Sequence, residues 1–184
     1  FPQLKTFMLE TLIIFMGSAA MFYVSRGALS NPDSHGFYRF FAWESILGLI
    51  ALNFSAEAAN SLEPHQLISA FLRVISLGLV IHAVILLVKR GKPTPARADS
   101  VLLAFEQTSS LVTSGAFKYI RHPMYASLLA LAWGEFFRQV SWLGFLLVLA
   151  ASVFLYLTSK RDGEECLAYF GSEYQCYMQR TKRF

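Results

Sequence analysis

The sequence contains few charged residues. Asp, Glu, Lys and Arg make up 15% of the 184 residues, whereas hydrophobic residues make up 55%. A soluble domain has about 25% charged residues and a slightly smaller apolar share. This composition argues against an ordinary soluble domain and favours a protein that buries its side chains in a bilayer.

Cysteine is also scarce. Cys166 and Cys176 are the only two, and both fall in the C-terminal tail. We predict that this tail faces the reducing cytoplasm, where a disulfide is disfavoured. The tail contains no histidine that could complete a zinc site. The sequence therefore predicts two ordinary thiols and no metal site.

Long apolar runs, by contrast, are abundant. A bilayer crossing needs about 20 mostly apolar residues, and five stretches qualify: 7–25, 37–56, 67–88, 124–140 and 142–159. Beyond Lys160 the tail has a helical pattern that breaks at Phe170-Gly171, with Ser172 as the expected N-cap of a last helix. We therefore predict an all-α polytopic membrane protein with five transmembrane helices and a cytoplasmic C-terminal helical tail.

The basic residues are distributed unevenly between the two predicted membrane faces. With five crossings, thirteen Lys and Arg residues lie on one side and three on the other. The larger set is Arg26, Arg39, Lys89, Arg90, Lys92, Arg97, Lys118, Arg121, Lys160, Arg161, Arg180, Lys182 and Arg183; the smaller is Lys5, Arg73 and Arg138. The positive-inside rule then predicts a multi-pass protein of the cell membrane with its N-terminus outside and its C-terminus in the cytoplasm. Because this charge faces anionic lipid headgroups, the net charge of +4 predicts no nucleic-acid partner.

Five ionisable residues lie in or near the apolar runs: Glu10, Glu44, Arg73, His82 and Glu135. Such residues are expensive to place in a membrane and often mark functional sites. The alternative is that they reach water at the interface or pair with one another.

The segment GAFKYIRHPMYAS, residues 115–127, carries the densest polar cluster beside an apolar run. Pro123 suits the first turn of a helix and pushes His122 towards an extended conformation, so we expect His122 at the cap position. A helix start favours an anion, and Arg121 adds a positive charge beside it. The motif predicts an anion site, with Tyr125 one turn inside. Alternatively, Arg121 and His122 extend to lipid phosphates at a helix end.

Two neighbouring features favour a ligand site. The run SSLVTSGAF, residues 109–117, places small residues and a glycine next to hydrophobic residues. This pattern is typical of a segment whose backbone comes close to a ligand. Where the last apolar run ends, Arg161 and Glu165 lie four residues apart on one helix face, with Glu164 beside them. These carboxylates could hold the hydroxyls or the amino group of a charged ligand.

Two segments resemble the isoprenylcysteine carboxyl methyltransferase (ICMT) family, and within it the archaeal integral membrane methyltransferase. They are LVTSGAFKYIRHPMY and RDGEECLAYFGSEYQCYMQRTKRF, and a hairpin of two predicted crossings separates them. The resemblance covers about residues 105–184. It implies an enzyme that methylates a lipophilic substrate at the cytoplasmic face, with S-adenosyl-L-methionine as cofactor and S-adenosyl-L-homocysteine as product. The substrate would be a prenylated small molecule or protein C-terminus. Oligomeric state is not predicted.

The resemblance also implies which residues form the site. Its cofactor pocket corresponds to Ser109, Ser110, Leu111, Val112, Phe117, His122, Pro123, Met124, Tyr125 and Glu165. Glu164 is the alternative to Glu165, because the spacing to Phe170-Gly171 is shorter here than in many relatives. Arg121 suits the cofactor carboxylate, and Arg161 corresponds to the arginine that binds the substrate. We predict Arg161 and Glu165 as catalytic residues, residues 1–90 as a substrate-facing and lipid-facing region, and residues 91–184 as the cofactor-binding catalytic region.

Other reactions and roles are compatible with the same residues. A substrate carboxylate is already ionised near pH 7 and needs no base. A lipid amine, as in phospholipid N-methyltransferases, must lose a proton, so His122 or a glutamate would act as general base. Membrane reductases that bind NADPH resemble the same half of the chain. A non-enzymatic membrane scaffold would use the polar clusters only as interfacial anchors.

Overall fold

The computed structural model describes residues 2–54, 63–94 and 102–184, except for the side chains of residues 2–7 and 10. Within these ranges the fold consists of helices and contains no β-strand beyond two isolated bridges. The helices are α1 (Pro2–Leu29), α2 (His35–Leu52), α3 (Pro64–Arg90), the 3-10 helix η1 (Gly115–Lys118), α4 (Pro123–Arg138), α5 (Trp142–Phe170) and α6 (Ser172–Arg180). The predicted all-helical class is confirmed for the described residues.

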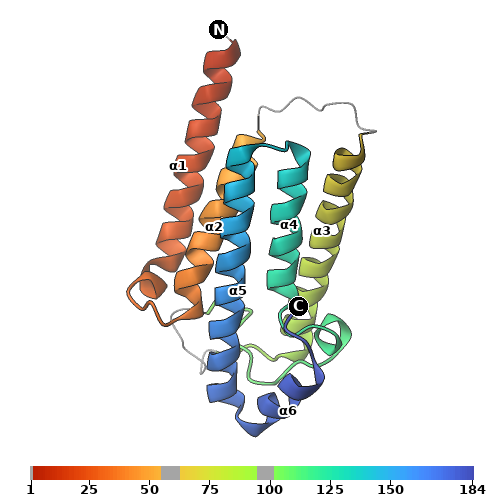
Figure 1. The fold of residues 1–184 in the computed structure, drawn as a ribbon. Helices are drawn as coiled ribbons and strands as arrows, with labels where there is room; N and C mark the ends of the chain where they lie inside the picture. Colours follow the sequence, from red (N-terminus) through yellow and green to blue (C-terminus); the bar gives the residue numbers. More distant parts are fainter. Residues whose placement is uncertain (1, 55–62, 95–101) are drawn as a thin grey trace.

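Helices α1 to α5 form one bundle whose spatial order differs from the chain order. Helix α1 packs on α2, α2 on α5, α5 on α4 and α4 on α3, so the helices lie side by side in the order α1, α2, α5, α4, α3 (Figure 1). The main core lies where α2, α4 and α5 meet, around Leu49, Ala132 and Val148. The outer faces of α1, α3 and α5 expose large apolar side chains, as expected of surfaces in contact with lipid.

Among the described residues, three helical segments are long and apolar enough to cross a membrane: Thr11–Leu29, Pro64–Arg90 and Trp142–Phe170. Helices also occupy the other two predicted stretches, but α2 has 18 residues and α4 has 16. At about 1.5 Å per residue, α4 is shorter than the roughly 30 Å hydrocarbon core. The number of crossings therefore stays a prediction. The end of the stretch 37–56 lies outside the described residues.

Proline, serine and glycine set the helix ends that frame the site. Helix α4 begins at Pro123 with His122 at the N-cap, which confirms the expectation from the sequence. Ser141 caps α5 by accepting a hydrogen bond from the backbone N–H of Gly144 at 3.1 Å. Gly171 has φ +59 and ends α5, as predicted. The expectation that Ser172 caps α6 was wrong: Gly171 takes the N-cap position and Ser172 is the first helical residue.

Several ionisable residues of the bundle have partners. Glu135 lies 3.3 Å from the Arg73 guanidinium, and its backbone carbonyl accepts a hydrogen bond from Asn53. Glu44 accepts one from the Ser18 hydroxyl at 2.6 Å. These contacts favour the pairing interpretation over a functional one. The side chain of Glu10 lies outside the described residues.

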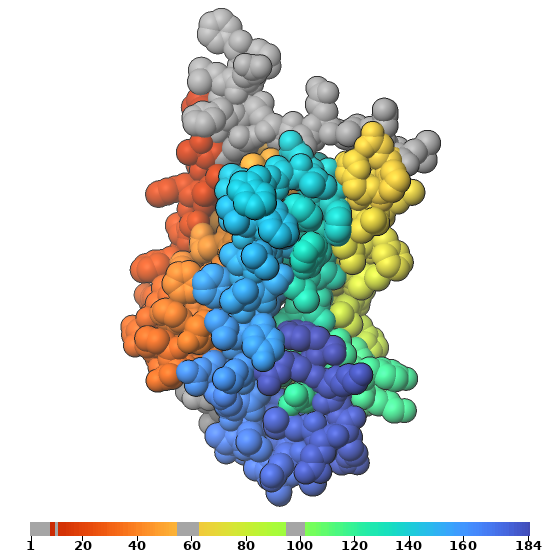
Figure 2. All heavy atoms as spheres, in the orientation of Figure 1, coloured from red at the N-terminus to blue at the C-terminus, as the bar shows by residue number. Residues whose placement is uncertain are grey.

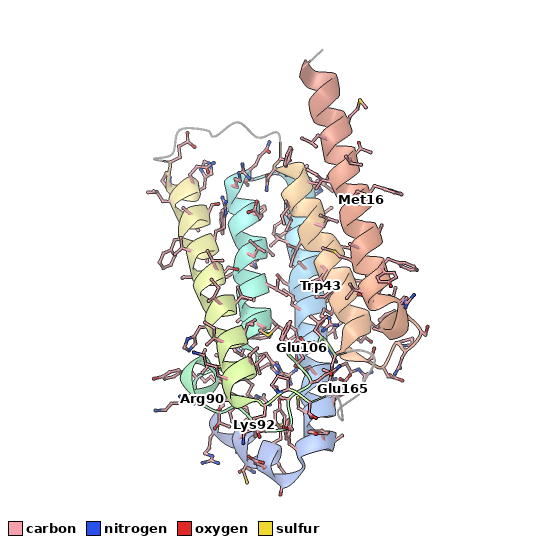
Figure 3. All side chains as sticks on the ribbon, turned by 180° about the vertical axis from the view of Figure 1, so that it is seen from behind. Met16, Trp43, Arg90, Lys92, Glu106 and Glu165 are labelled. Atoms are coloured by element: carbon pink, nitrogen blue, oxygen red, sulfur yellow. The ribbon has the colours of Figure 1, made fainter. Side chains whose placement is uncertain are left out.

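One end of the bundle collects the polar groups and the loops. Helix α3 ends there, α4 begins there, and α5 extends to a tight turn that leads into α6 (Figure 1). Seen from behind, Arg90, Lys92, Glu106 and Glu165 all lie at this end, whereas Met16 and Trp43 lie higher along the bundle (Figure 3). The fold thus gathers at one end the segments 102–125 and 160–184, which are separate in the sequence.

Candidate active site

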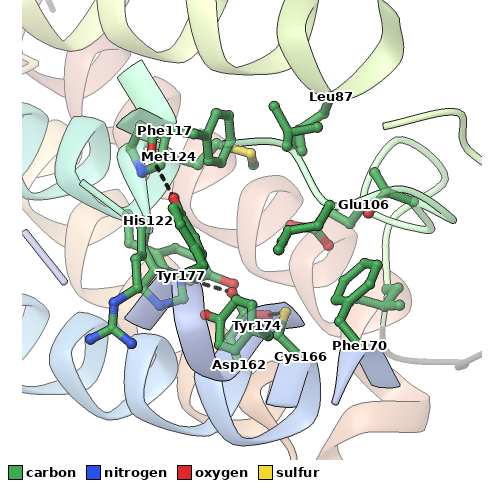
Figure 4. Close-up of a pocket in the computed structure, with 17 residues that line it drawn as sticks. Leu87, Glu106, Phe117, His122, Met124, Asp162, Cys166, Phe170, Tyr174 and Tyr177 are labelled. Carbon is green, nitrogen blue, oxygen red and sulfur yellow. Dashed lines mark hydrogen bonds and ion pairs between the residues drawn. The ribbon is translucent and has the colours of Figure 1, made fainter. Parts of the chain in front are cut away.

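A cavity at this polar end is the best-formed candidate site. It includes about 670 Å³ of space between atoms, its open mouth included. Its wall comes from the end of α3, the loop before η1, the start of α4, the end of α5 and α6 (Figure 4). The lining residues are Leu87, Leu102, Glu106, Thr108, Leu111, Val112, Phe117, Arg121, His122, Pro123, Met124, Tyr125, Asp162, Cys166, Phe170, Tyr174 and Tyr177.

A tight turn at Gly115 holds the loop against α3. Gly115 has φ +60, and a Cβ added there would lie 2.6 Å from Leu86 Cδ1 and 2.7 Å from His82 Nε2. Only glycine fits this conformation and this close approach. His82 Nε2 also accepts the backbone N–H of Ala116 at 3.3 Å, so His82 has a structural role here. The turn carries Phe117 into the buried cluster that lines the cavity.

The C-terminal segment closes the cavity from the other side. The Tyr177 hydroxyl donates to the carbonyl of Phe117 at 2.5 Å, a bond visible in Figure 4. The backbone N–H of Arg121 donates to the carbonyl of Lys182 at 2.8 Å. Burial raises the pKa of Tyr177 to about 12 and also raises the pKa of Tyr174. Both phenols are therefore neutral hydrogen-bonding groups at physiological pH.

A histidine–aspartate pair lies in the wall of the cavity. His122 Nδ1 and Asp162 Oδ2 are 3.0 Å apart, and the His122 ring stacks on Tyr125 with ring centroids 5.6 Å apart. His122 Nε2 is buried and has no hydrogen-bond partner among the described residues. With Asp162 accepting from Nδ1–H, Nε2 of the neutral ring is an acceptor. This is the arrangement of an oriented base.

A second polar pair connects the first hairpin of the chain to α5. Glu165 accepts the backbone N–H of His35 at 2.8 Å and contacts His35 Nδ1 at 2.5 Å. Burial lowers the pKa of His35, but Glu165, through its hydrogen bond and charge, and the nearby Asp162 outweigh it, so the pKa is raised above its usual value. Beside this pair, the buried Arg39 binds Glu106 at 2.8 Å. Both contacts hold α2 against the site.

His35, Asp162 and Glu165 each offer a possible metal-ligand atom, and these atoms lie within 4.8 Å of one another. Hydrogen bonds already account for all three groups: Glu165 binds His35, and Asp162 binds His122. Nothing further in the structure indicates a metal at this cluster.

The residues predicted from the sequence fall into two groups. Eight of them meet at the cavity: Leu111, Val112, Phe117, Arg121, His122, Pro123, Met124 and Tyr125. Ser109 and Ser110 do not line it; their backbone N–H groups both donate to the carbonyl of Gly91 at 3.0 Å and anchor the loop to the end of α3. The cofactor roles of all ten stay predictions.

The predicted residues of α5 lie on other faces of that helix. Arg161 pairs with Asp33 and Glu164 at 3.0 Å each, and Glu165 pairs with His35. None of the three predicted residues, Arg161, Glu164 and Glu165, lines the cavity. The face towards the cavity is instead Asp162, Cys166 and Phe170, which follow one another at four-residue spacing. The predicted roles of Arg161, Glu164 and Glu165 stay predictions.

Sequence reasoning missed several lining residues. Asp162 and Cys166 could have been predicted, because Asp162, Cys166 and Phe170 follow one another at four-residue spacing and so share one helix face. Tyr174 and Tyr177 show the matching three-residue spacing on α6, and both are buried. Glu106 lies in the loop before η1, and its partner Arg39 of α2 is remote in the sequence. His35 does not line the cavity, and it has no local signal because only the packing of α2 on α5 brings it to Glu165.

Comparison with known proteins identifies one family. A sequence model of the phospholipid methyltransferase family matches residues 66–169, a stretch that runs from the start of α3 almost to the end of α5 and covers more than half of the chain. No curated protein and no solved structure matches the chain. Proteins of this family are membrane methyltransferases that act on lipids and generally use S-adenosylmethionine. The chain belongs to the phospholipid methyltransferase family.

Proposed function

We propose that the chain transfers a methyl group from S-adenosylmethionine to the amine of a membrane lipid, and that the reaction takes place in the cavity described above. One observation carries the choice of an amine: His122 is oriented by Asp162 and keeps a buried Nε2 without a partner among the described residues. An amine substrate needs such a base, whereas a carboxylate does not.

The groups around the cavity match the chemistry of the cofactor. Asp162 and Glu106 supply carboxylates for its ammonium and ribose hydroxyls. Leu111, Val112 and Phe117 supply an apolar slot for adenine. Arg121 and the start of α4 supply positive charge for its carboxylate. We therefore propose that these residues, with Pro123, Met124 and Tyr125, hold the cofactor.

The proposed reaction is a displacement in which the protein positions the groups and accepts a proton. The bound cofactor supplies a methyl group activated by its sulfonium. His122 Nε2 takes the proton from the substrate ammonium, and the freed nitrogen lone pair forms the new N–C bond as the C–S bond breaks. Asp162 stabilises the imidazolium that results. Tyr174 and Tyr177, whose phenols are neutral at physiological pH and whose pKa burial raises further, help to exclude water without adding charge.

A second candidate is methylation of a carboxylate on an isoprenylcysteine-like substrate, as the ICMT resemblance implies. The observation in its favour is Arg121, whose guanidinium Nε is buried at the cavity wall with no partner among the described residues. In this reaction Arg121, or the sequence-predicted Arg161, would orient the carboxylate. Arg161 is the weaker choice because Asp33 and Glu164 already bind it.

The test uses purified protein in lipid with methyl-labelled S-adenosylmethionine and a panel of lipid amines and prenylcysteines. We expect the label on an amine, stable to mild base. Label released by mild base identifies a methyl ester and selects the second candidate. Binding of NADPH, but not of S-adenosylmethionine, by folded protein would refute both and favour a reductase. Binding of neither would favour a scaffold.

We also propose that all five long helices cross the bilayer, with the N-terminus outside and the polar end in the cytoplasm. In this arrangement residues 91–184 form the catalytic region, and residues 1–90 face substrate and lipid. The large apolar surfaces of α1, α3 and α5 support this arrangement, and a lipophilic substrate would then enter sideways from the bilayer. Labelling of cysteines introduced at residues 31 and 139, in a background without the two native cysteines, tests the topology. Residue 31 should react only from the cytoplasmic side and residue 139 only from outside.

A further inference from the structure

We infer that Arg39 is a positioning residue for the cavity: it fixes the carboxylate of Glu106, so that the first turns of α2 form part of the cofactor site. Arg39 does not itself line the cavity. It also lies before residue 66, where the match to the phospholipid methyltransferase family begins. The inference rests on the proposed function, which assigns Glu106 to the ammonium or the ribose hydroxyls of the cofactor.

Two hydrogen bonds fix the Glu106 carboxylate. Its Oε2 accepts one from Arg39 Nη1 at 2.8 Å and one from the backbone N–H of Leu103 at 2.9 Å. The Leu103 bond is local, because the N–H of Glu106 in turn donates to the carbonyl of Leu103 at 2.8 Å and closes a turn. The Arg39 bond joins this turn to α2. Both bonds end on Oε2, so a ligand in the cavity would bind Oε1.

Arg39 suits this role because contacts within α2 and with α5 fix its own position. His35, Arg39 and Trp43 follow one another at four-residue spacing and share a face of α2. The Arg39 guanidinium carbon lies 4.9 Å from the centroid of the Trp43 ring, and Nη1 lies 3.4 Å from His35 Nε2. His35 in turn binds Glu165 of α5. In Figure 2 the orange atoms of the first hairpin lie against the blue atoms of α5 in the lower half of the molecule.

Burial makes the Arg39–Glu106 contact important for binding. The two side chains are 3% and 11% exposed, and a buried carboxylate stays charged most readily beside a cation. Without Arg39, Glu106 would take up a proton or turn towards water, and the cavity would lose a negative charge for the cofactor ammonium. Figure 4 shows Glu106 apart from His122 in the cavity wall. The loss should therefore weaken cofactor binding and leave proton transfer at His122 intact.

The experiment measures S-adenosylmethionine binding to the full chain in dodecyl maltoside by titration calorimetry, for Arg39→Met, Glu106→Gln and the double variant. We expect each single substitution to raise the dissociation constant about tenfold. The double variant should bind no more than about twofold more weakly than either single one, because Arg39 acts through Glu106. At saturating cofactor, kcat for lipid amine methylation should stay within about threefold of wild type.

Two further variants serve as controls. Arg73 forms an ion pair with the buried Glu135, and neither residue lines the cavity. Arg73→Met should therefore change the dissociation constant less than about twofold. Arg39→Lys keeps the charge but loses the guanidinium fork, so its affinity should lie between those of wild type and Arg39→Met. If Arg39→Met does not fold, Arg39→Gln is measured in its place, with the same expected loss.

The possible results separate this inference from the proposed function. A folded wild type that binds no S-adenosylmethionine would refute the proposed function and the role of Arg39 with it. If the wild type binds, unchanged affinity in Arg39→Met would overturn the role of Arg39 alone. A double variant weakened about a hundredfold would also overturn it, because the two effects would then be independent.

Two other results would contradict the positioning role. A loss of affinity in Arg73→Met as large as that in Arg39→Met would show a general effect of a lost ion pair. A fall in kcat at saturating cofactor as large as the loss of affinity would show that Arg39 supports the whole cavity and not the Glu106 carboxylate.

Discussion

Replacing Asp162 by Asn tests whether His122 is an oriented base. The substitution keeps the size of the side chain but replaces a charged acceptor by a neutral amide. The His122 Nδ1 to Asp162 Oδ2 distance is 3.0 Å, with the histidine buried and the aspartate half-buried. A hydrogen bond to a charged group contributes about 1.5–3 kcal/mol, and each 1.4 kcal/mol or so is tenfold in rate. We therefore expect kcat for lipid amine methylation to fall about tenfold to a hundredfold.

The assay is transfer of labelled methyl to the lipid amine at saturating cofactor, with cofactor affinity measured separately by calorimetry. Glu63→Gln is the control, because Glu63 precedes α3 at the opposite end of the bundle, and its kcat should stay within about twofold of wild type. An Asp162→Asn enzyme that binds cofactor and turns over at the wild-type rate would refute the role of the pair. A loss confined to cofactor affinity, with kcat intact, would reassign Asp162 to cofactor binding alone.

Three further predictions concern the supports of the site. The pKa of His35 is higher in the folded protein than its unfolded value of about 6.5, so His35 stabilises the fold at pH values below 6.5 and loses this contribution as the pH rises through the folded pKa. Tm in detergent should therefore fall over that pH range in the wild type and fall less in His35→Gln. Parallel Tm curves for the two proteins would contradict this prediction. Gly115→Ala should destabilise the protein by about 1–3 kcal/mol, through φ +60 and two close contacts. Gly171→Ala, with a similar φ but open space, should cost less, and equal Tm losses would show that the contacts do not matter. Arg161→Ala should leave kcat and the KM for the lipid substrate unchanged, because Arg161 lies outside the cavity lining. A tenfold loss in either would restore the sequence-based prediction that Arg161 binds the substrate.

Much of the architecture follows from local sequence. The apolar runs predict helices because a backbone in lipid must satisfy its own hydrogen bonds, and a helix covers most of each of the five predicted stretches. Pro123 fixed the start of α4, since proline lacks an N–H and suits a first helical turn. Gly171 fixed the end of α5, since its φ is positive. The segment 111–125 could be predicted as one wall of a site because most of its residues are adjacent in the chain.

What the sequence alone did not determine is which face of α5 meets that wall. Asp162 and Glu165 are one turn apart on the same helix, and both are acidic. The packing of α2 on α5 rotates Glu165 onto His35, 130 positions away, and leaves Asp162 facing the cavity. In the same way, only the return of the chain after α6 brings Lys182 beside Arg121. Local sequence sets helix periodicity and ends, but the rotation of one helix against another and the meeting of distant segments depend on contacts that no local pattern records, so only the tertiary structure could decide them.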